Sequence, residues 1–321
     1  MSAAPKAPRP LVVRDRALAV GDIGPLNLLF SDAFSDRYRR DGLVGVRVPP
    51  LNPAIWRYAI EGAAGGATCW VDEHGELLAF NIAHRSGTEG WMGPLAVRPD
   101  LQGSGLGRDV VTRGIEWLTR SGCTVIGLET MPRTMDNIGF YSRLGFVPAR
   151  LTVTFTVEAR KARCTLLSHL GPGEAAAAVA GCAALVARLQ PGVDFTREID
   201  LTRALGIGDT VLVMNGDDVA GFALCHAAAL IEGRPRDELR VLKLAVRDME
   251  TLAPLVTAVG GYAREAGTPR AAIRMQGDYP DAYQYLASIG GRVRWTDLRM
   301  ALRSHPETVA RGGVVLSNWE I

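Results

Sequence analysis

The stretch Leu95–Gly107 constrains this chain more than any other part of its sequence. It joins the end of an apolar run to a loop with three glycines, and a helical pattern of apolar residues follows the loop. Glycines at the start of a helix leave several backbone N–H groups open to an anion, because no Cβ atom covers them. The order of strand, glycine loop and helix therefore predicts a site for a phosphate or pyrophosphate group.

The spacing of the glycines leaves two other interpretations open. They read Gly103-x-Gly105-x-Gly107, whereas an NAD-binding Rossmann domain has the spacing G-x-G-x-x-G. The segment Arg98–Gln102 also separates the strand from the glycines, while a Rossmann fold turns tightly off its strand. In favour of that fold, Glu129 stands roughly where its ribose-binding acid is found. An NAD-binding domain and a glycine-rich turn without a ligand are thus the alternatives.

A second motif lies in the segment Asn137–Pro148, which reads Asn-Ile-Gly-Phe-Tyr-Ser-Arg-Leu-Gly-Phe-Val-Pro. A short helical pattern carrying Tyr141 ends at Gly145, the usual position of a C′ glycine, and a β-rich run follows at Leu151–Val157. Together with the loop Gln102-x-x-Gly105-x-Gly107, this segment closely resembles the GNAT acetyltransferase superfamily.

The resemblance implies that the glycine loop holds the pyrophosphate of acetyl-CoA. Tyr141 matches the family's tyrosine beside the thioester sulfur, so it is expected to protonate the leaving thiolate. The expected general base is Glu129 or Glu89, which lie near positions where family members often place a carboxylate. The strand Leu95–Val97 is expected to offer an N–H group to the carbonyl oxygen.

One departure from the family pattern affects the pantetheine arm. Many members carry an Asn seven residues before the Tyr, where this chain has Thr134, so either Thr134 or Asn137 is expected to touch the arm. The residues expected to bind the cofactor are Leu95, Ala96, Val97, Gln102, Gly103, Ser104, Gly105, Leu106, Gly107, Arg108, Thr134 and Asn137.

Strand and helix patterns alternate after an antiparallel start, which predicts an α/β fold with a mixed, mainly antiparallel sheet. The second half repeats the order of the first, including a hairpin with an Asn-Gly turn at Asn215–Asp218. The chain is therefore predicted to hold two tandem GNAT-like domains, each a mixed sheet flanked by helices. Their predicted bounds are 11–158 for the catalytic domain and 165–321 for a degenerate one.

The second half lacks both motifs of the first. The loop Arg247–Leu252 has no glycine and two acids, so a pyrophosphate would meet like charge there. Leu286 stands at the position that corresponds to Tyr141. The domain 165–321 is thus expected to bind no coenzyme A, and to form a wall of the amine site or an oligomer interface.

Composition narrows the partners of the chain. A net charge of +2 does not favour nucleic acid. The apolar segment Glu174–Leu189 is shorter than the ~20 residues of a membrane span, and the tail 1–10 lacks the apolar core of a secretory signal. Five scattered cysteines without a C-x-x-C motif predict reduced thiols in the cytoplasm, and five isolated histidines predict no metal site.

The predicted function is an N-acetyltransferase that moves acetyl from acetyl-CoA directly to an amine. The amine belongs to a small molecule or a peptide that the sequence does not identify, and homo-oligomerisation is left open. The alternative from another class is a sensor that binds acyl-CoA without turnover; such a protein would have no use for Tyr141.

Overall fold

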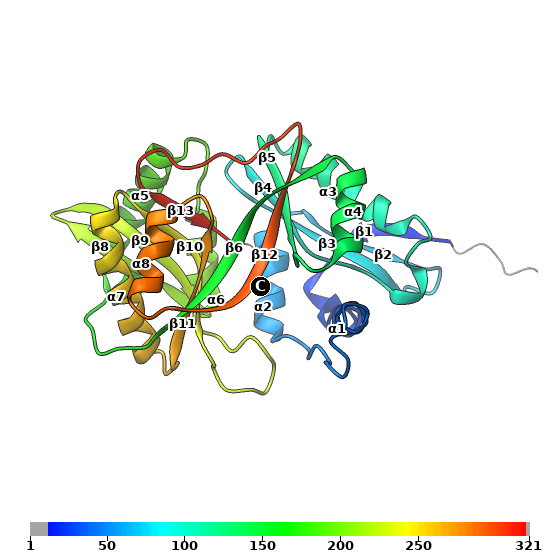
Figure 1. Cartoon of the computed structure of the whole chain (residues 1–321), viewed down its shortest axis with the longest axis horizontal. Helices are drawn as coiled ribbons and strands as arrows, with labels where there is room; N and C mark the ends of the chain where they lie inside the picture. The colour runs from blue at the N-terminus through cyan, green and yellow to red at the C-terminus, as the bar shows by residue number, and fades with distance from the viewer. Residues whose placement is uncertain (1–11, 319–321) are drawn as a thin grey trace, which may run out of the picture.

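The computed structural model describes residues 12–318, in which 13 strands form one continuous sheet (Figure 1). Helices cover the sheet, so the predicted α/β class with a mixed, mainly antiparallel sheet is confirmed. The predicted tail 1–10 and Leu11, the start of the first predicted strand, lie outside the described residues.

The first half of the chain contains six strands and four α-helices, with short 3-10 turns before α1 and α3. In chain order they are β1 (Arg14–Ala17), α1 (Ile23–Arg40), α2 (Pro53–Gly62), β2 (Ala67–Val71), β3 (Leu77–Ser86), β4 (Glu89–Val97), α3 (Leu106–Arg120), β5 (Val125–Thr130), α4 (Met135–Arg143) and β6 (Phe146–Glu158).

The second half contains seven strands and four α-helices. In chain order they are β7 (Thr165–Leu166), α5 (Pro172–Leu189), α6 (Thr196–Leu205), β8 (Gly208–Asn215), β9 (Asp218–His226), β10 (Leu239–Val246), α7 (Met249–Glu265), β11 (Arg270–Gln276), α8 (Pro280–Ser288), β12 (Arg292–Leu302) and β13 (Val314–Ser317). The predicted hairpin is present between β8 and β9.

Helix α1 is longer than its apolar pattern predicts. That pattern ends at Phe34, but the helix continues to Arg40. Asp36 pairs with Arg40, and Arg37 pairs with Asp41, each at the i,i+4 spacing that stabilises a helical turn. Charge pairing rather than apolar periodicity therefore sets the end of this helix.

Helix α5 has 18 residues and is apolar enough to cross a membrane by length and composition. A third of its length is buried, and the buried side chains, among them Cys182, Leu185 and Val186, pack against Phe222 of β9. The helix therefore contributes one face to the core of the second half, as its sequence pattern predicts.

The two halves exchange strands at the middle of the sheet. The order of strands is β1-β2-β3-β4-β5-β12-β6-β11-β10-β9-β8-β7, so β12 of the second half lies between β5 and β6 of the first. The second part of β6 in turn pairs with the whole of β11, from Thr152 opposite Gln276 to Glu158 opposite Arg270. Figure 1 shows β6 and β12 side by side at the junction of the halves.

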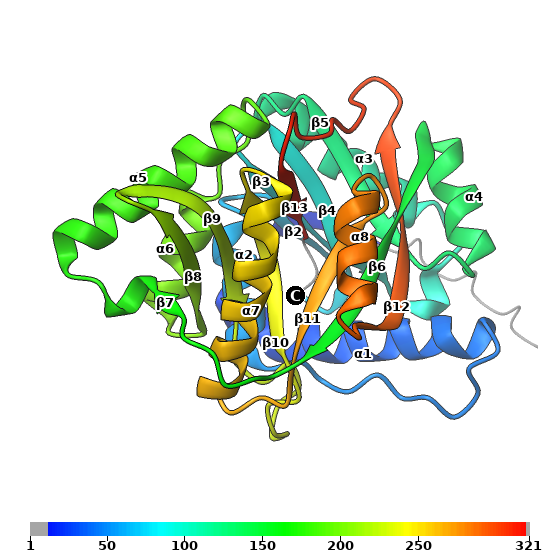
Figure 2. The ribbon, with the colours of Figure 1, turned by 60° about the vertical axis from the view of Figure 1, so that its left-hand side comes forward.

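Each half contains one pair of parallel strands that part along their length. In the first half, β4 pairs with β5 as far as Met92 opposite Leu128, and Leu95–Val97 then continues beside β3 alone. In the second half, β10 pairs with β11 only as far as Val241 opposite Ile273. Beyond that point β10 pairs with β13, which runs antiparallel to it (Figure 2).

Candidate active site

The glycine loop presents three backbone amides at the start of α3. Gly105 is the N-cap residue with a left-handed backbone (φ +100°), and Gly103 also has a positive φ (+83°). Within residues 12–318, the N–H groups of Gly103, Gly105 and Gly107 donate to no protein acceptor. A Cβ atom at Gly105 would meet nothing within 4 Å, so the loop faces open space. This is the arrangement that binds a phosphate group.

The other predicted residues of the loop divide into two groups. Gln102 and Arg108 line the cavity described below, and the Gln102 amide donates to the carbonyl oxygen of Val97, which holds the loop against β4. Ser104 instead donates to the Leu101 carbonyl, and Leu106 is buried under the sheet beside Val110. Ser104 and Leu106 therefore support the loop from behind.

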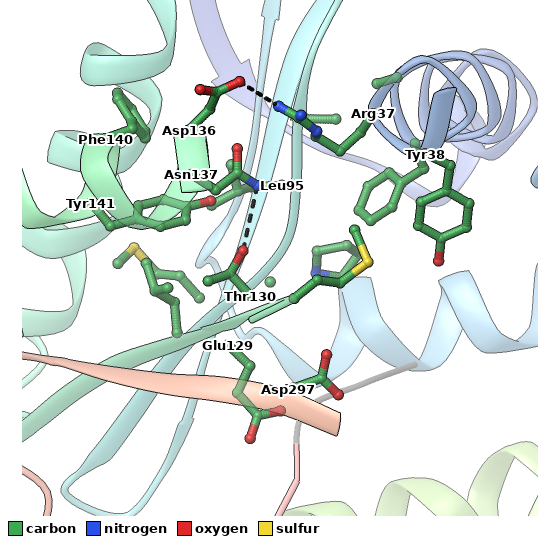
Figure 3. Close-up of a pocket in the computed structure, with 18 of the residues that line it drawn as sticks. Arg37, Tyr38, Leu95, Glu129, Thr130, Asp136, Asn137, Phe140, Tyr141 and Asp297 are labelled. Carbon is green, nitrogen blue, oxygen red and sulfur yellow. Dashed lines mark hydrogen bonds and ion pairs between the residues drawn. The ribbon is translucent and has the colours of Figure 1, made fainter. Parts of the chain in front are cut away.

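Tyr141 lies on α4 with its ring packed between Phe140 and Phe146, at centroid distances of 5.2 and 6.2 Å. Its side chain is 7% exposed and also lines the cavity. Figure 3 shows the hydroxyl pointing toward the middle of the pocket. Burial raises the pKa of Tyr141 to about 12, so the phenol keeps its proton at neutral pH.

The structure separates the two candidates for the pantetheine contact. Asn137 lines the cavity, and its amide lies 3.4 Å from the hydroxyl oxygen of Thr130 (Figure 3). Thr134 is fully buried and donates to the Asp41 carboxylate over 2.6 Å, which ties the start of α4 to the end of α1. Of the two, only Asn137 lines the cavity.

Glu129 lies in the cavity wall at the end of β5, inside a network of ion pairs. It accepts from Arg274 and from Arg299, and from the Thr152 hydroxyl over 2.5 Å. Burial alone would raise the pKa of Glu129, but the two guanidinium groups and the Thr152 hydroxyl hold it below its ordinary value. The carboxylate is therefore ionised at neutral pH and a weak base.

Glu89 stands at the other end of β4 and does not line the cavity. It borders a separate polar space of about 10 Å³ together with Arg299 and Glu307. Burial raises the pKa of Glu89 above its ordinary value. The structure thus brings Glu129 to the cavity with Tyr141, and leaves Glu89 outside it.

The cavity has a volume of about 820 Å³ and is formed by both halves of the chain. From the first half it includes β4, the glycine loop, α4 and the aromatic side chain of Tyr38 on α1. From the second half it includes charged and aromatic side chains that no sequence motif marks: Glu238, Arg240, Arg274, Arg294, Trp295 and Asp297. Tyr38 and Trp295 face each other across the halves, with ring centroids 6.5 Å apart.

The corresponding region of the second half is built differently. Asp248 caps α7 by accepting from the backbone N–H of Thr251 over 2.8 Å, so a carboxylate already occupies this helix start. Strand β13 fills the gap where β10 leaves β11, and Ser317 pairs there with Lys243. Leu286 is fully buried in the apolar core. Among residues 12–318, no three His, Cys, Asp or Glu side chains are grouped to hold a metal ion.

Comparisons with known proteins place these features in a family. Residues 31–146 match the model of the acetyltransferase (GNAT) family. A stretch of 67 residues, 21% of this chain, is 33% identical to the N-alpha-acetyltransferase MAK3 of Arabidopsis thaliana and spans 35% of that relative's length.

Solved structures resemble the whole fold. One, from Pyrococcus horikoshii and assigned as an acetyltransferase, superposes with a TM-score of 0.64 over 95% of both chains at 16% identity. Another, a tandem GNAT protein from the clavulanic acid biosynthesis pathway, has a TM-score of 0.59 over 92% of this chain and 100% of its own, at 14% identity. Residues 31–146 therefore form a domain of the GNAT acetyltransferase family, and the fold of the whole chain is similar to that of a tandem GNAT protein.

Proposed function

We propose that this protein transfers an acetyl group from acetyl-CoA directly to an amine, using a single site in the first half. The observation that carries the proposal is the glycine loop, where the backbone N–H groups of Gly103, Gly105 and Gly107 donate to no acceptor within the described residues. These three residues line the same cavity as Tyr141. Acetyl-CoA would supply an activated thioester there. The amide bond forms and the C–S bond breaks, while the amine loses one proton and the sulfur gains one, so that in net balance the proton from the amine replaces the one that Tyr141 gives to the sulfur.

Three parts of the site have separate tasks. The helix start binds the pyrophosphate through N–H groups and the positive end of the α3 dipole, with Arg108 beside it. A backbone N–H group of Leu95–Val97 donates to the carbonyl oxygen of the thioester, as the family resemblance implies. Tyr141 remains protonated because of its raised pKa, so it donates to the sulfur as negative charge develops.

The proton of the attacking amine needs a different acceptor. Glu129 is a weak base because two arginines hold its pKa low, and Glu89 lies outside the cavity. We infer that water in the cavity takes the proton and that Glu129 acts as a positioning residue, which fixes Arg274 in the cavity wall. This replaces the direct role that the sequence suggests for either carboxylate.

The second half is proposed to form the wall of the amine site and to bind no coenzyme A. Its helix start is capped by Asp248 and its strand gap is filled by β13, so both parts of a coenzyme site are occupied by the chain itself. It contributes Trp295 and Asp297 to the shared cavity instead. The proposed domain bounds, 11–158 and 165–321, follow the sequence repeat. Strand β12 of the second domain nevertheless lies between β5 and β6 of the first.

The acceptor is proposed to be an amine on a small molecule or a peptide, since the cavity opens between the halves. The five cysteines are free thiols, which suits a cytoplasmic location.

Calorimetry of the full chain with acetyl-CoA tests the proposal, together with thiol release in the presence of a broad panel of primary amines. One acetyl-CoA per chain and amine-dependent thiol release are expected. Binding without thiol release for any amine would instead indicate an acyl-CoA sensor. Binding of NAD in place of acetyl-CoA, or two acetyl-CoA molecules per chain, would contradict the proposed site.

A further inference from the structure

Asp41 joins the end of α1 to the start of α4 through both its side chain and its backbone. Its carboxylate accepts a hydrogen bond from the Thr134 hydroxyl over 2.6 Å and another from the Arg37 guanidinium group over 2.5 Å. Its carbonyl oxygen accepts from Arg133, the residue before Thr134. The Asp41 side chain is 6% exposed, and Thr134 is fully buried. The two helices therefore meet at a carboxylate that is shielded from water.

Neither Asp41 nor Thr134 follows the preference of its own helix. Asp41 is the C-cap residue of α1, where the helix dipole is negative and disfavours a carboxylate. Thr134 is the N-cap residue of α4, where a hydroxyl usually accepts from a backbone N–H group of the first turn. Here the hydroxyl makes no such bond and donates to Asp41 instead. The pair therefore stabilises the contact between the helices, and it does so against the preference of α1.

An ion pair beside this contact joins the same two helices. Arg37 and Asp136 both line the cavity, and their side chains are 3.2 Å apart. Figure 3 shows this pair connecting α4 to α1 above Asn137. The Asp136 side chain is 79% exposed, so water screens its charge and the pair contributes little. The buried hydrogen bond between Thr134 and Asp41 is therefore the main link.

Helix α4 carries Tyr141 and depends on its start for its position. The helix has 9 residues, of which only Tyr141 is buried, while Ile138 and Phe140 are partly buried. Thr134 precedes Tyr141 by seven residues, or about two helical turns, so both lie on the same side of the helix. A shift of the helix start therefore moves the Tyr141 hydroxyl, and a misplacement of about 1 Å can slow a reaction on the order of 100-fold.

Helix α1, at the other end of the link, belongs to the acceptor side of the cavity. Phe34 and Tyr38 of this helix line the cavity, and the Tyr38 ring meets that of Trp295 from the second half. The bond between Asp41 and Thr134 thus connects the wall proposed to bind the amine with the helix that carries the proposed acid.

We propose that Asp41 is a positioning residue of the acetyl transfer. By holding Thr134 it fixes α4 against α1, and it thereby places the Tyr141 hydroxyl at the sulfur of the thioester. Asp41 does not line the cavity, so it acts through α4 rather than on a reactant. The inference rests on the proposed acetyl transfer with Tyr141 as the acid, and it adds the group that holds this acid in place.

Single-turnover thiol release by the full chain tests the inference in a double-mutant cycle with Tyr141→Phe. Thr134→Val keeps the shape of the side chain without its hydroxyl and should slow thiol release at least about tenfold. In the Tyr141→Phe background the same change should alter the rate by less than about twofold, because no hydroxyl remains to be placed. Asp41→Asn should show the same pattern. Acetyl-CoA affinity, measured by calorimetry, should stay within about threefold, because the glycine loop on α3 is unchanged.

Two variants of matched chemistry are the controls. Thr134→Ser keeps the hydroxyl donor and should retain at least about half of the rate. Thr251→Val removes a hydroxyl that also donates to a carboxylate, that of Asp248, over 2.6 Å at the start of a helix. That helix is α7, none of whose residues line the cavity, so this variant should keep the rate within about twofold.

Amide hydrogen exchange measures the link without turnover. Thr134→Val should speed exchange in residues 135–143 and leave exchange in residues 106–120 unchanged. The inference is overturned if Thr134→Val leaves the rate or the exchange of α4 unchanged. It is also overturned if the rate falls equally with and without the Tyr141 hydroxyl, since the loss would then not act through that group. Failure of the parent chain to release thiol with any amine would overturn the proposed function, while exchange would still report whether Asp41 holds α4.

Discussion

Arg299 of β12 donates a hydrogen bond from Nη1 to Oε1 of Glu129 on β5, over 2.8 Å. The two side chains are 2% and 13% exposed, and they belong to different halves of the chain. Arg274 of β11 binds the other carboxylate oxygen. The strands exchanged between the halves are therefore joined by a buried network of ion pairs, and part of that network forms the cavity wall.

Replacing Glu129 with Gln should lower the free energy of unfolding by about 3 kcal/mol at pH 7, because it removes the buried carboxylate that pairs with both Arg274 and Arg299. The pKa of Glu129 is lower in the folded chain than its ordinary value of 4.5, because Arg274 and Arg299 outweigh the effect of burial. Its stabilisation is thus present above pH 4.5 and is lost as the pH falls through the folded value. Urea unfolding at pH 7 and at pH 3.5 measures both effects.

The difference in stability between parent and variant should shrink at the lower pH. Glu158→Gln, an exposed position at the end of β6, serves as the control and should change stability by less than about 0.5 kcal/mol. An equal loss at both pH values would contradict the role of Glu129 ionisation.

Gly105→Val should weaken acetyl-CoA binding at least about 100-fold, or about 2.7 kcal/mol, while the chain stays folded. The side chain would occupy the open space in front of the loop amides. The left-handed backbone adds a strain of about 1–2 kcal/mol. Calorimetry measures the affinity.

Gly122→Val is the control that distinguishes backbone strain from blocking of the space in front of the loop amides. Gly122 also has a positive φ, of +79°, with nothing within 4 Å of an added Cβ, but it lies at the far end of α3. Equal losses of affinity in both variants would mean that the glycine loop is not the pyrophosphate site.

Tyr141→Phe should reduce the rate of the chemical step by about 10²–10⁴-fold and leave acetyl-CoA affinity within about twofold. Only the hydroxyl is removed, and the ring keeps its contacts with Phe140 and Phe146. Single-turnover thiol release measures the step. Tyr283→Phe, which removes the hydroxyl of a tyrosine on α8 whose ring packs against Phe155, is the control. An unchanged rate would make Tyr141 a packing residue.

Local features of the sequence are sufficient to predict the elements of the proposed coenzyme side of the site. The glycine loop, the helix after it and the Tyr141 segment each occupy a short run of residues, so backbone preferences and spacing identify them. Boundaries of strands such as β10, Leu239–Val246, follow from their apolar runs in the same way.

The acceptor side depends on pairing between distant segments. Asp297 reaches Arg274 and Arg274 reaches Glu129 only because β12 enters the sheet between β5 and β6. Short β13 was not expected either, since three apolar residues and a serine after an irregular stretch carry no period of their own. No local pattern encodes which strand lies beside which, and the cavity wall proposed to bind the amine is built from those neighbouring strands.

A fragment of residues 1–160 expressed alone should aggregate, although its sequence carries both coenzyme motifs. Without the second half, β6 loses β12 and β11 on its two sides, and β5 presents an open edge from Gly127 to Thr130. Unpaired apolar edges of this kind promote association. Co-expression with residues 161–321 should yield a soluble one-to-one complex that binds one acetyl-CoA, measured by size-exclusion chromatography and calorimetry. A monomeric, folded fragment 1–160 with the affinity of the full chain would show that the strand exchange is not needed for the coenzyme site.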